Sequence, residues 1–362
     1  MPPAMTFPYA SPAVRWLGPL GLLLVLTAFI SNSGMPTGAD SKKAPPPARV
    51  RTFNFEYATT VRDLPPSAQA VELWLPVPHS DKSQNISNLK IDSPYPYKIE
   101  KGQYGNQMLH LKMTNPPAQP FAVTMRFRAT RREHLNPVAA PTKASITEAL
   151  DPNMTRWLQP DRLVPLDDQI RRWAQEVVTE AHAQTDLEKA EAIYNHVVST
   201  VKYDKTGQSW GRGDIYYACD ARRGNCSDFH AVFIGYCRAL GIPARFSIGF
   251  PLPVGQGTGE VKGYHCWAEF FTPETGWVPV DASEAAKDPK RRAYFFGAHD
   301  ENRVEFSRGR DLTLAPRQQA SPLNYFIYPY AEVDGQPFTS LEQHFRYQDL
   351  KMPPSTSKSA SK

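Results

Sequence analysis

The chain has 362 residues, of which 41% are hydrophobic and 21% are charged, and this balance excludes both a disordered chain and a coiled coil. Its 41 basic and 36 acidic residues leave a formal charge of +5 without any basic block, so the sequence does not indicate a nucleic-acid partner. The 35 prolines, roughly twice the usual share, favour strands, loops and linkers over long helices, and the length predicts two domains.

The N-terminal segment has the pattern of an export signal. Arg15 precedes an apolar run over residues 17–30, which is shorter than the roughly 20 residues that span a membrane but fits the apolar region of a signal peptide. We therefore expect residues 1–33 to be a signal peptide, with an uncleaved membrane anchor as the alternative, and the protein to be periplasmic or extracellular. Residues 34–48 are rich in proline and glycine and are expected to form a linker. Residues 353–362 are expected to form a disordered tail.

The segment that follows the linker alternates between apolar and polar residues with a period of two. Phe53, Phe55 and Tyr57 share one face of the first such stretch. The same alternation returns in three later stretches, at residues 71–75, 108–113 and 121–130. Turn residues separate the stretches, so we expect residues 49–134 to form an antiparallel β-sandwich. No catalytic cluster is visible in this segment, which indicates a structural or substrate-presenting domain.

The segment 135–352 has a different pattern, which predicts helices followed by strands. Apolar residues at helical spacing indicate a helix around residues 170–178, and Thr185 and Glu188 form a capping-box pattern at the start of a second helix. A third helix is expected over residues 226–240, ended by Gly241 and Pro243. Strands are then expected at residues 244–250, 264–271 and 277–281. This order is typical of an α+β domain.

Cys226 stands at the head of the third predicted helix. A thiol at a helix N-terminus lies near unpaired N–H groups and the positive end of the helix dipole, and both favour the thiolate. The same N–H groups can stabilise the oxyanion that forms when a thiolate attacks a carbonyl. Most free cysteines are instead small buried apolar residues. Cys237, deep in the same helix, fits that second interpretation, and so does Cys266.

A thiolate nucleophile needs a base, and the base needs an orienting group. His230 lies one helical turn after Cys226 and could reach the sulfur, but a packing role is common for histidine at that spacing. His265 lies on a predicted strand, followed by a turn and a second strand that ends at Asp281. Glu269 shares the strand face of His265 and is an alternative orienting group, although a solvated charge is the more common role.

The face on which Asp281 falls depends on the length of the hairpin loop. If residues 272–276 form the loop, Phe271 pairs with Trp277, and Asp281 lies one diagonal step from His265. A loop of even length would place the two side chains on opposite faces. The catalytic arrangement of Cys226, His265 and Asp281 therefore predicts a loop of odd length.

Three ordered motifs together resemble the transglutaminase-like superfamily, over about residues 185–285. They are Arg-Arg-Gly-Asn-Cys-Ser-Asp-Phe-His at 222–230 with its helix to 245, Tyr-His-Cys-Trp at 264–267 and Trp-Val-Pro-Val-Asp at 277–281. The resemblance implies a papain-like α+β fold in which the nucleophile helix packs on an antiparallel sheet. It implies that Cys226 is the nucleophile, His265 the general base and acid, and Asp281 the orienting residue. It also implies an aromatic or polar side chain, upstream of the cysteine, at the oxyanion, for which Trp210, Tyr216 and Tyr217 are candidates.

The implied reaction is acyl transfer on an amide or peptide carbonyl through a thioester intermediate. Water as acceptor gives a hydrolase or cysteine protease, and an amine gives a transglutaminase-type acyltransferase. We expect a protein or peptide substrate, no cofactor and no metal, and contact with a membrane only through an N-terminal anchor.

Three alternatives to this enzyme remain open from the sequence. The first is a zinc site, although the cysteines at 219, 226, 237 and 266 lack the close spacing that such a site commonly has. In an oxidising compartment Cys219 could form a disulfide with Cys226, which would block the nucleophile, or with Cys237 or Cys266, which would leave it free. A cell-envelope binding module could retain the fold without catalysis, although such a module commonly loses one of the three catalytic residues.

Overall fold

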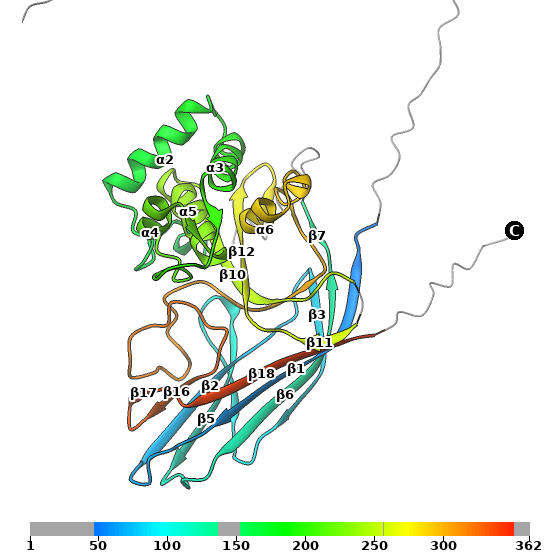
Figure 1. Ribbon diagram of the computed structural model, residues 1–362, viewed down its shortest axis with the longest axis vertical. Coiled ribbons are helices and arrows are strands. Elements are labelled where there is room, and N and C mark those ends of the chain that lie inside the picture. Colours follow the sequence, from blue (N-terminus) through cyan, green and yellow to red (C-terminus); the bar gives the residue numbers. More distant parts are fainter. Residues whose placement is uncertain (1–46, 137–152, 256, 351–362) are drawn as a thin grey trace, which may run out of the picture. The chain divides into compact units, whose positions relative to one another are not determined.

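The computed structural model describes residues 47–136, 153–255 and 257–350 (Figure 1). The expected signal peptide, most of the expected linker and the expected C-terminal tail lie outside these residues. Within the described ranges, none of the helices combines the length and the apolar character that crossing a membrane requires.

Two five-stranded antiparallel sheets form a β-sandwich in the described part of the chain. The first has the strand order β11-β18-β1-β6-β3 and the second the order β17-β16-β2-β5-β4. The strands from the N-terminal segment are β1 (Val50–Val61), β2 (Ala70–Val77), β3 (Gln84–Asp92), β4 (Lys98–Lys101), β5 (Gln107–Thr114) and β6 (Phe121–Arg132). The remaining strands are β11 (Thr258–Glu260), β16 (Tyr330–Val333), β17 (Gln336–Phe338) and β18 (Leu341–Asp349).

The alternation predicted from the sequence is the alternation of burial in the sandwich. Every second residue of β6, from Phe121 to Arg131, is buried, and Phe55 and Tyr57 of β1 are buried in the same way. The ring of Phe55 stacks on that of Phe127 at 5.5 Å. Side chains that point inward from paired strands therefore supply the apolar core that holds the sandwich together.

The division of the chain differs from the expected boundaries at residues 49–134 and 135–352. Strand β18 pairs with β1 along residues 53–61, and β16 pairs with β2, so C-terminal strands complete both sheets of the sandwich. The described residues from Pro47 onward form one compact unit. Strand pairing between the two ends of a chain leaves no local pattern, and for this reason the expected range 135–352 includes residues 330–349, which pair with strands of the sandwich.

The rest of the described chain forms an α+β core around a four-stranded antiparallel sheet of order β13-β12-β10-β15. The strands are β10 (Ala244–Pro251), β12 (His265–Thr272), β13 (Gly276–Val280) and β15 (Arg303–Arg308). The helices are α2 (Asp168–Glu180), α3 (Asp186–Thr200), α4 (Ile215–Ala221), α5 (Cys226–Ala239) and α6 (Ala282–Lys287). Two short pairs add β7 (His134–Leu135) with β14 (Ala298–His299), and β8 (Lys202–Tyr203) with β9 (Arg223–Gly224). The predicted α+β class and the capping box at Thr185 and Glu188 are confirmed.

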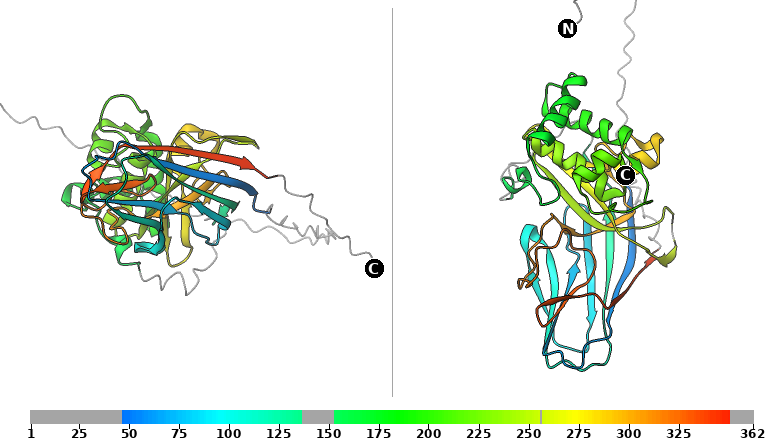
Figure 2. Two further views of the ribbon diagram at one scale, coloured as in Figure 1. Left: turned by 90° about the horizontal axis from the view of Figure 1, so that it is seen from below. Right: turned by 60° about the vertical axis from the view of Figure 1, so that its left-hand side comes forward.

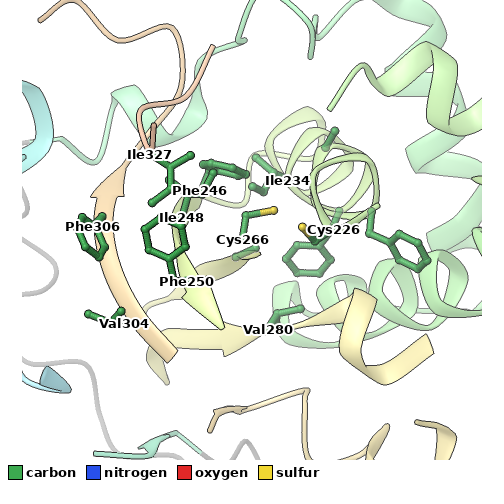
Figure 3. Close-up of a cluster of buried hydrophobic side chains, with 14 of the residues drawn as sticks. Cys226, Ile234, Phe246, Ile248, Phe250, Cys266, Val280, Val304, Phe306 and Ile327 are labelled. Atoms are coloured by element: carbon green, nitrogen blue, oxygen red, sulfur yellow. The ribbon is translucent and has the colours of Figure 1, made fainter. Parts of the chain in front are cut away.

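Helix α5 lies at the centre of this core. All its residues are buried, because α2, α3 and α4 surround it and its remaining side packs on β12 and β10 (Figures 1 and 2). The opposite side of the sheet packs on the sandwich, where Phe250 and Phe306 contact Phe55. The close-up in Figure 3 shows this continuous apolar cluster, in which Cys226 of α5 and Cys266 of β12 lie where the helix packs on the sheet. The helix that bears Cys226 is thus held on every side by tertiary packing.

Candidate active site

The residues around Cys226 fix the start of α5. Asn225 is the N-cap, and its side chain accepts a hydrogen bond from the N–H of Ser227 at 2.9 Å. The carboxylate of Asp228 accepts one in return from the N–H of Asn225, also at 2.9 Å. Gly224 has φ +157°, and a Cβ there would lie 2.2 Å from the Asp228 carboxylate, so only glycine leaves this space. These local interactions place the thiol in the first turn of the helix.

The hairpin of β12 and β13 brings Asp281 to His265. Phe271 pairs with Trp277, as the odd-length loop requires, and the loop itself is residues 273–275, shorter than the expected 272–276. His265 is the first residue of β12, and its Nε2 lies 2.8 Å from Oδ2 of Asp281, which directly follows β13. Both side chains are buried.

The thiol and the imidazole are linked by a hydrogen bond between the side chains of Cys226 and His265. Since Nε2 faces Asp281, Nδ1 is the ring nitrogen that remains for the sulfur. Burial alone would raise the pKa of the Cys226 thiol, but hydrogen bonds from Cys266 and His265 and the charge of His265 outweigh it and hold that pKa well below its usual range. Burial opposes protonation of His265, but the charge and hydrogen bond of Asp281 raise its pKa to about 10. The favoured state is therefore a thiolate beside an imidazolium.

Asp281 is held by three further donors. Its Oδ1 accepts hydrogen bonds from the hydroxyl of Ser283 and the N–H of Glu284, both at 3.1 Å, because Asp281 is also the N-cap of α6. Its Oδ2 accepts a hydrogen bond from Arg303 at 2.9 Å, and Arg303 also binds Asp300. Burial disfavours a charged Asp281, but the cations His265 and Arg303 hold its pKa well below the usual range. Arg303 was not predicted from the sequence, because no spacing links a residue of β15 to the end of β13.

His230 is brought close to this site but faces away from the sulfur. Its Nδ1 lies 2.8 Å from the carbonyl oxygen of Cys226, and its Nε2 accepts a hydrogen bond from the N–H of Ala282 at 3.3 Å. These partners assign the proton to Nδ1 and leave the ring neutral. Burial lowers the pKa of His230 further. The ring therefore ties the first turn of α5 to the residue after Asp281.

Other candidate residues lie elsewhere. Glu269 binds Arg245 at 2.6 Å and faces His134 rather than His265, so it does not orient the imidazole. The hydroxyl of Tyr216 donates to Asp167 at 2.7 Å, which occupies it away from the sulfur.

Two further aromatic candidates were Trp210 and Tyr217. The ring of Trp210 lies 5.9 Å from the ammonium of Lys205, and Tyr217 lies on α4 with no contact to Cys226 among those the structure describes. Tyr264 was not among the candidates from the sequence, yet its hydroxyl contacts both Asn225 and Ser227 at 2.9 Å. Its position directly before His265 was the available signal.

All four cysteines are free, so none of the disulfide pairings considered from the sequence is present. Cys237 is buried within α5 as expected. Cys266 is also buried, and both its backbone and its side chain hydrogen-bond to the sulfur of Cys226; Figure 3 shows the two sulfur atoms facing one another. Across the described ranges, no group of three or more His, Cys, Asp and Glu side chains is arranged to hold a metal ion.

A cleft of ≈ 400 Å³ opens beside the imidazole of His265. Tyr203 and Tyr264 line it, together with residues of α6 and of the segment before β12. Burial and the charge on Cys226 raise the pKa of Tyr203 to about 12 and raise that of Tyr264 as well. The cleft is the route by which a carbonyl group could approach Cys226, which is itself buried.

Comparison with known proteins matches residues 171–282 to the family model of the transglutaminase-like superfamily. An uncharacterized protein of Haemophilus influenzae is 28% identical over 316 residues, which cover 76% of this chain and 84% of that protein. A protein-glutamine gamma-glutamyltransferase of Pseudomonas aeruginosa is 30% identical over 145 residues, 37% of this chain and 20% of that protein. Among solved structures, a candidate cysteine protease from Cytophaga hutchinsonii has a TM-score of 0.55 at 16% identity, covering 84% of this chain and 92% of that one, and it shares the fold.

Proposed function

Because residues 171–282 of this chain belong to the transglutaminase-like superfamily, we propose that the protein is a thiol enzyme acting on amide or peptide carbonyls through Cys226, His265 and Asp281. One observation carries the proposal: the three side chains form a buried, continuous hydrogen-bonded row in which the thiol pKa is lowered and the imidazole pKa is raised. Opposed shifts of this kind in neighbouring groups are typical of a nucleophile and its acid–base partner.

In the proposed first half-reaction, the Cys226 thiolate attacks the carbonyl carbon and the oxygen becomes an oxyanion. Asn225 occupies the N–H groups of Ser227 and Asp228, which leaves the N–H of Cys226 as the first-turn donor for that oxyanion. The His265 imidazolium then gives its proton to the leaving amine as the C–N bond breaks. A thioester on Cys226 and a neutral imidazole result.

In the second half-reaction, the neutral imidazole of His265 takes a proton from the acceptor as it attacks the thioester. Water as acceptor releases a carboxylic acid, and an amine forms a new amide. Asp281 keeps the imidazole oriented and stabilises its charged form in both halves. The acceptor therefore decides whether the enzyme is a hydrolase or an acyltransferase.

The test uses p-nitrophenyl acetate, an activated ester that any nucleophilic thiol can open. We expect a burst of one equivalent of p-nitrophenolate per chain and an acetyl thioester on the peptide that contains Cys226, detected by mass spectrometry. Cys219 is a partly exposed thiol in the same chain and provides an internal control. Cys226→Ala should abolish the burst. Equal acetylation of Cys219 and Cys226 would overturn the proposal and favour a non-catalytic binding module.

The acceptor is then identified with the same acyl-enzyme. Adding glycine ethyl ester during turnover yields the acetylated amine if the thioester is opened by amines, and acetate alone if water is preferred. Ammonia release from a glutamine-containing peptide, with and without the amine, extends the assay to an amide substrate. The Cys226→Ala variant is the matched control throughout.

We also propose that the protein is exported. The support is Arg15 followed by the apolar run 17–30 and a proline-rich segment. Fractionation of cells that make the full chain, with mass determination of the mature protein, distinguishes a cleaved signal from an anchor. Recovery of the unprocessed chain in the cytoplasm would contradict export.

A further inference from the structure

The cleft beside His265 has an unequal distribution of charge. Three lysines line it, Lys205, Lys262 and Lys287, against two glutamates, Glu260 and Glu284. The imidazolium of His265 adds no net charge, because the thiolate of Cys226 lies beside it. The formal charge around the entrance to the site is therefore positive, although the chain as a whole is nearly balanced.

Both glutamates already have hydrogen-bonding partners. Glu284 lies 2.6 Å from the ammonium of Lys287, which in turn lies 3.9 Å from the centre of the Tyr203 ring. Glu260 lies 3.0 Å from Nδ1 of His344, and hydrogen bonds to Glu260 and Glu342 raise the pKa of His344. The ammonium of Lys287 thus offsets the charge of Glu284, and the raised pKa of His344 favours a partial offset of Glu260.

Lys205 and Lys262 are the cations that remain. In the part of the chain that the structure describes, neither forms an ion pair within 4.0 Å. The Lys205 ammonium lies 5.7 Å from the ring centre of Tyr203 and 5.9 Å from that of Trp210, so it lies along the aromatic wall of the cleft. Lys262 lies three residues before His265, is exposed, and also lines the cleft.

We propose that this cleft selects an acidic polypeptide, with carboxylates on the residues that flank the attacked carbonyl, and that Lys205 and Lys262 are the specificity-determining residues. The proposal rests on the proposed function, because it concerns the substrate of the same thiol. An acidic chain gains attraction to the two lysines, whereas a basic chain meets like charge at the entrance. Tyr203, which lines the cleft, adds apolar contact for the rest of the peptide.

The first test compares alkylation of Cys226 by iodoacetate, which is anionic, and by iodoacetamide, which is neutral and of similar size. The ratio of the two rates measures the electrostatic attraction of the cleft and cancels the intrinsic reactivity of the thiol. If each of the two lysine charges acts on the iodoacetate carboxylate from about 8 Å in a water-like medium, the two together change this ratio by about fivefold. We therefore expect the double variant Lys205→Met/Lys262→Met to lower the ratio by about fivefold at low salt, and less at high salt.

The matched control removes the same charge elsewhere. Lys98 and Lys101 are exposed on β4, far from the cleft lining, and the Lys98→Met/Lys101→Met variant should keep the wild-type ratio. An equal ratio in the wild type and the Lys205/Lys262 variant would overturn the proposed specificity while leaving the reactive thiol intact. A Cys226 that resists both reagents would instead overturn the proposed function itself.

A second test uses peptides as protecting ligands. Acetyl-Glu-Gln-Glu-amide should slow iodoacetamide alkylation of Cys226 at a lower concentration than acetyl-Lys-Gln-Lys-amide, and Lys205→Met/Lys262→Met should remove the difference. Equal protection by the two peptides in the wild-type protein would contradict an acidic substrate.

Discussion

Replacing His265 with glutamine, and separately His230 with glutamine, distinguishes the two histidines that lie close to Cys226. His265 shares a hydrogen bond with the thiol and carries the charge that lowers its pKa. His230 is neutral and has both ring nitrogens engaged by backbone groups. Only the first replacement should therefore change the ionisation of the thiol.

The magnitude follows from the fraction of thiolate. An ordinary thiol with a pKa of about 8.5 is about 0.3% ionised at about pH 6 and about 24% at about pH 8, a rise of roughly 75-fold. The wild-type thiol, whose pKa lies well below this range, is ionised at both values and should change less than about twofold. In His265→Gln, the charge that opposes the effect of burial on the thiol pKa is gone, so this pKa should rise. The rate of alkylation should then increase about tenfold per pH unit.

The assay is the rate of iodoacetamide alkylation of Cys226 between pH 6 and pH 8, read by mass spectrometry. We expect a flat profile for the wild type and for His230→Gln, and a steep profile for His265→Gln. Circular dichroism confirms that each variant is folded, and His265→Asn provides a second variant if the first is not. A flat profile in a folded His265 variant, or a steep one in His230→Gln, would refute the assignment of His265 as the partner of the thiol.

Three further predictions concern stability. Arg303→Met leaves Asp281 and Asp300 with one cation fewer in a buried site, which should lower the free energy of unfolding by about 3–5 kcal/mol. Calorimetry should therefore show a Tm lower by about 6 °C or more, with a smaller decrease in Arg303→Lys. An unchanged Tm would contradict the role of this ion pair. The raised pKa of His265, about 10, and the lowered pKa of Cys226 cancel in their effect on unfolding between the ordinary values of about 6.5 for histidine and about 8.5 for cysteine, because the folded and unfolded states then carry the same net charge. Above about pH 8.5 only the unfolded thiol loses its proton, so the stability due to the pair falls until about pH 10. Urea unfolding curves of the wild type and of Cys226→Ala/His265→Gln should approach one another over this range, and parallel curves would disprove the pairing. Deleting residues 341–362 removes β18 with its buried Phe345 and exposes the edge of β1, so cooperative unfolding in urea should be lost. Deleting only residues 353–362 should leave urea unfolding unchanged.

The local chemistry of the site could be predicted because it depends on neighbours in the chain. Gly224 and Asn225 start α5 at Cys226, and Gly241 ends it, through capping interactions that span only a few residues. The pairing of Phe271 with Trp277 follows from the two-residue period of a hairpin, and it carries His265 and Asp281 to the same place.

The contacts that tertiary structure alone decided join residues with no such relation. Arg303 meets Asp281 because β15 lies in the same sheet as β12 and β13, and His230 meets the N–H of Ala282 because α5 packs on α6. Strand β18 completes the sheet of β1 in the same way, and no local pattern in the C-terminal segment indicates that it returns to the sandwich.

The sequence by itself therefore determined the α+β class, the helix that begins at Cys226 and the hairpin that aligns His265 with Asp281. Capping and strand alternation encode such features within a short window of the chain. The tertiary structure decided which histidine faces the sulfur, which cation holds Asp281 and which strands close the sandwich. Those outcomes come from packing between segments far apart in the chain, where burial and charge pairing select one arrangement and no local pattern records it.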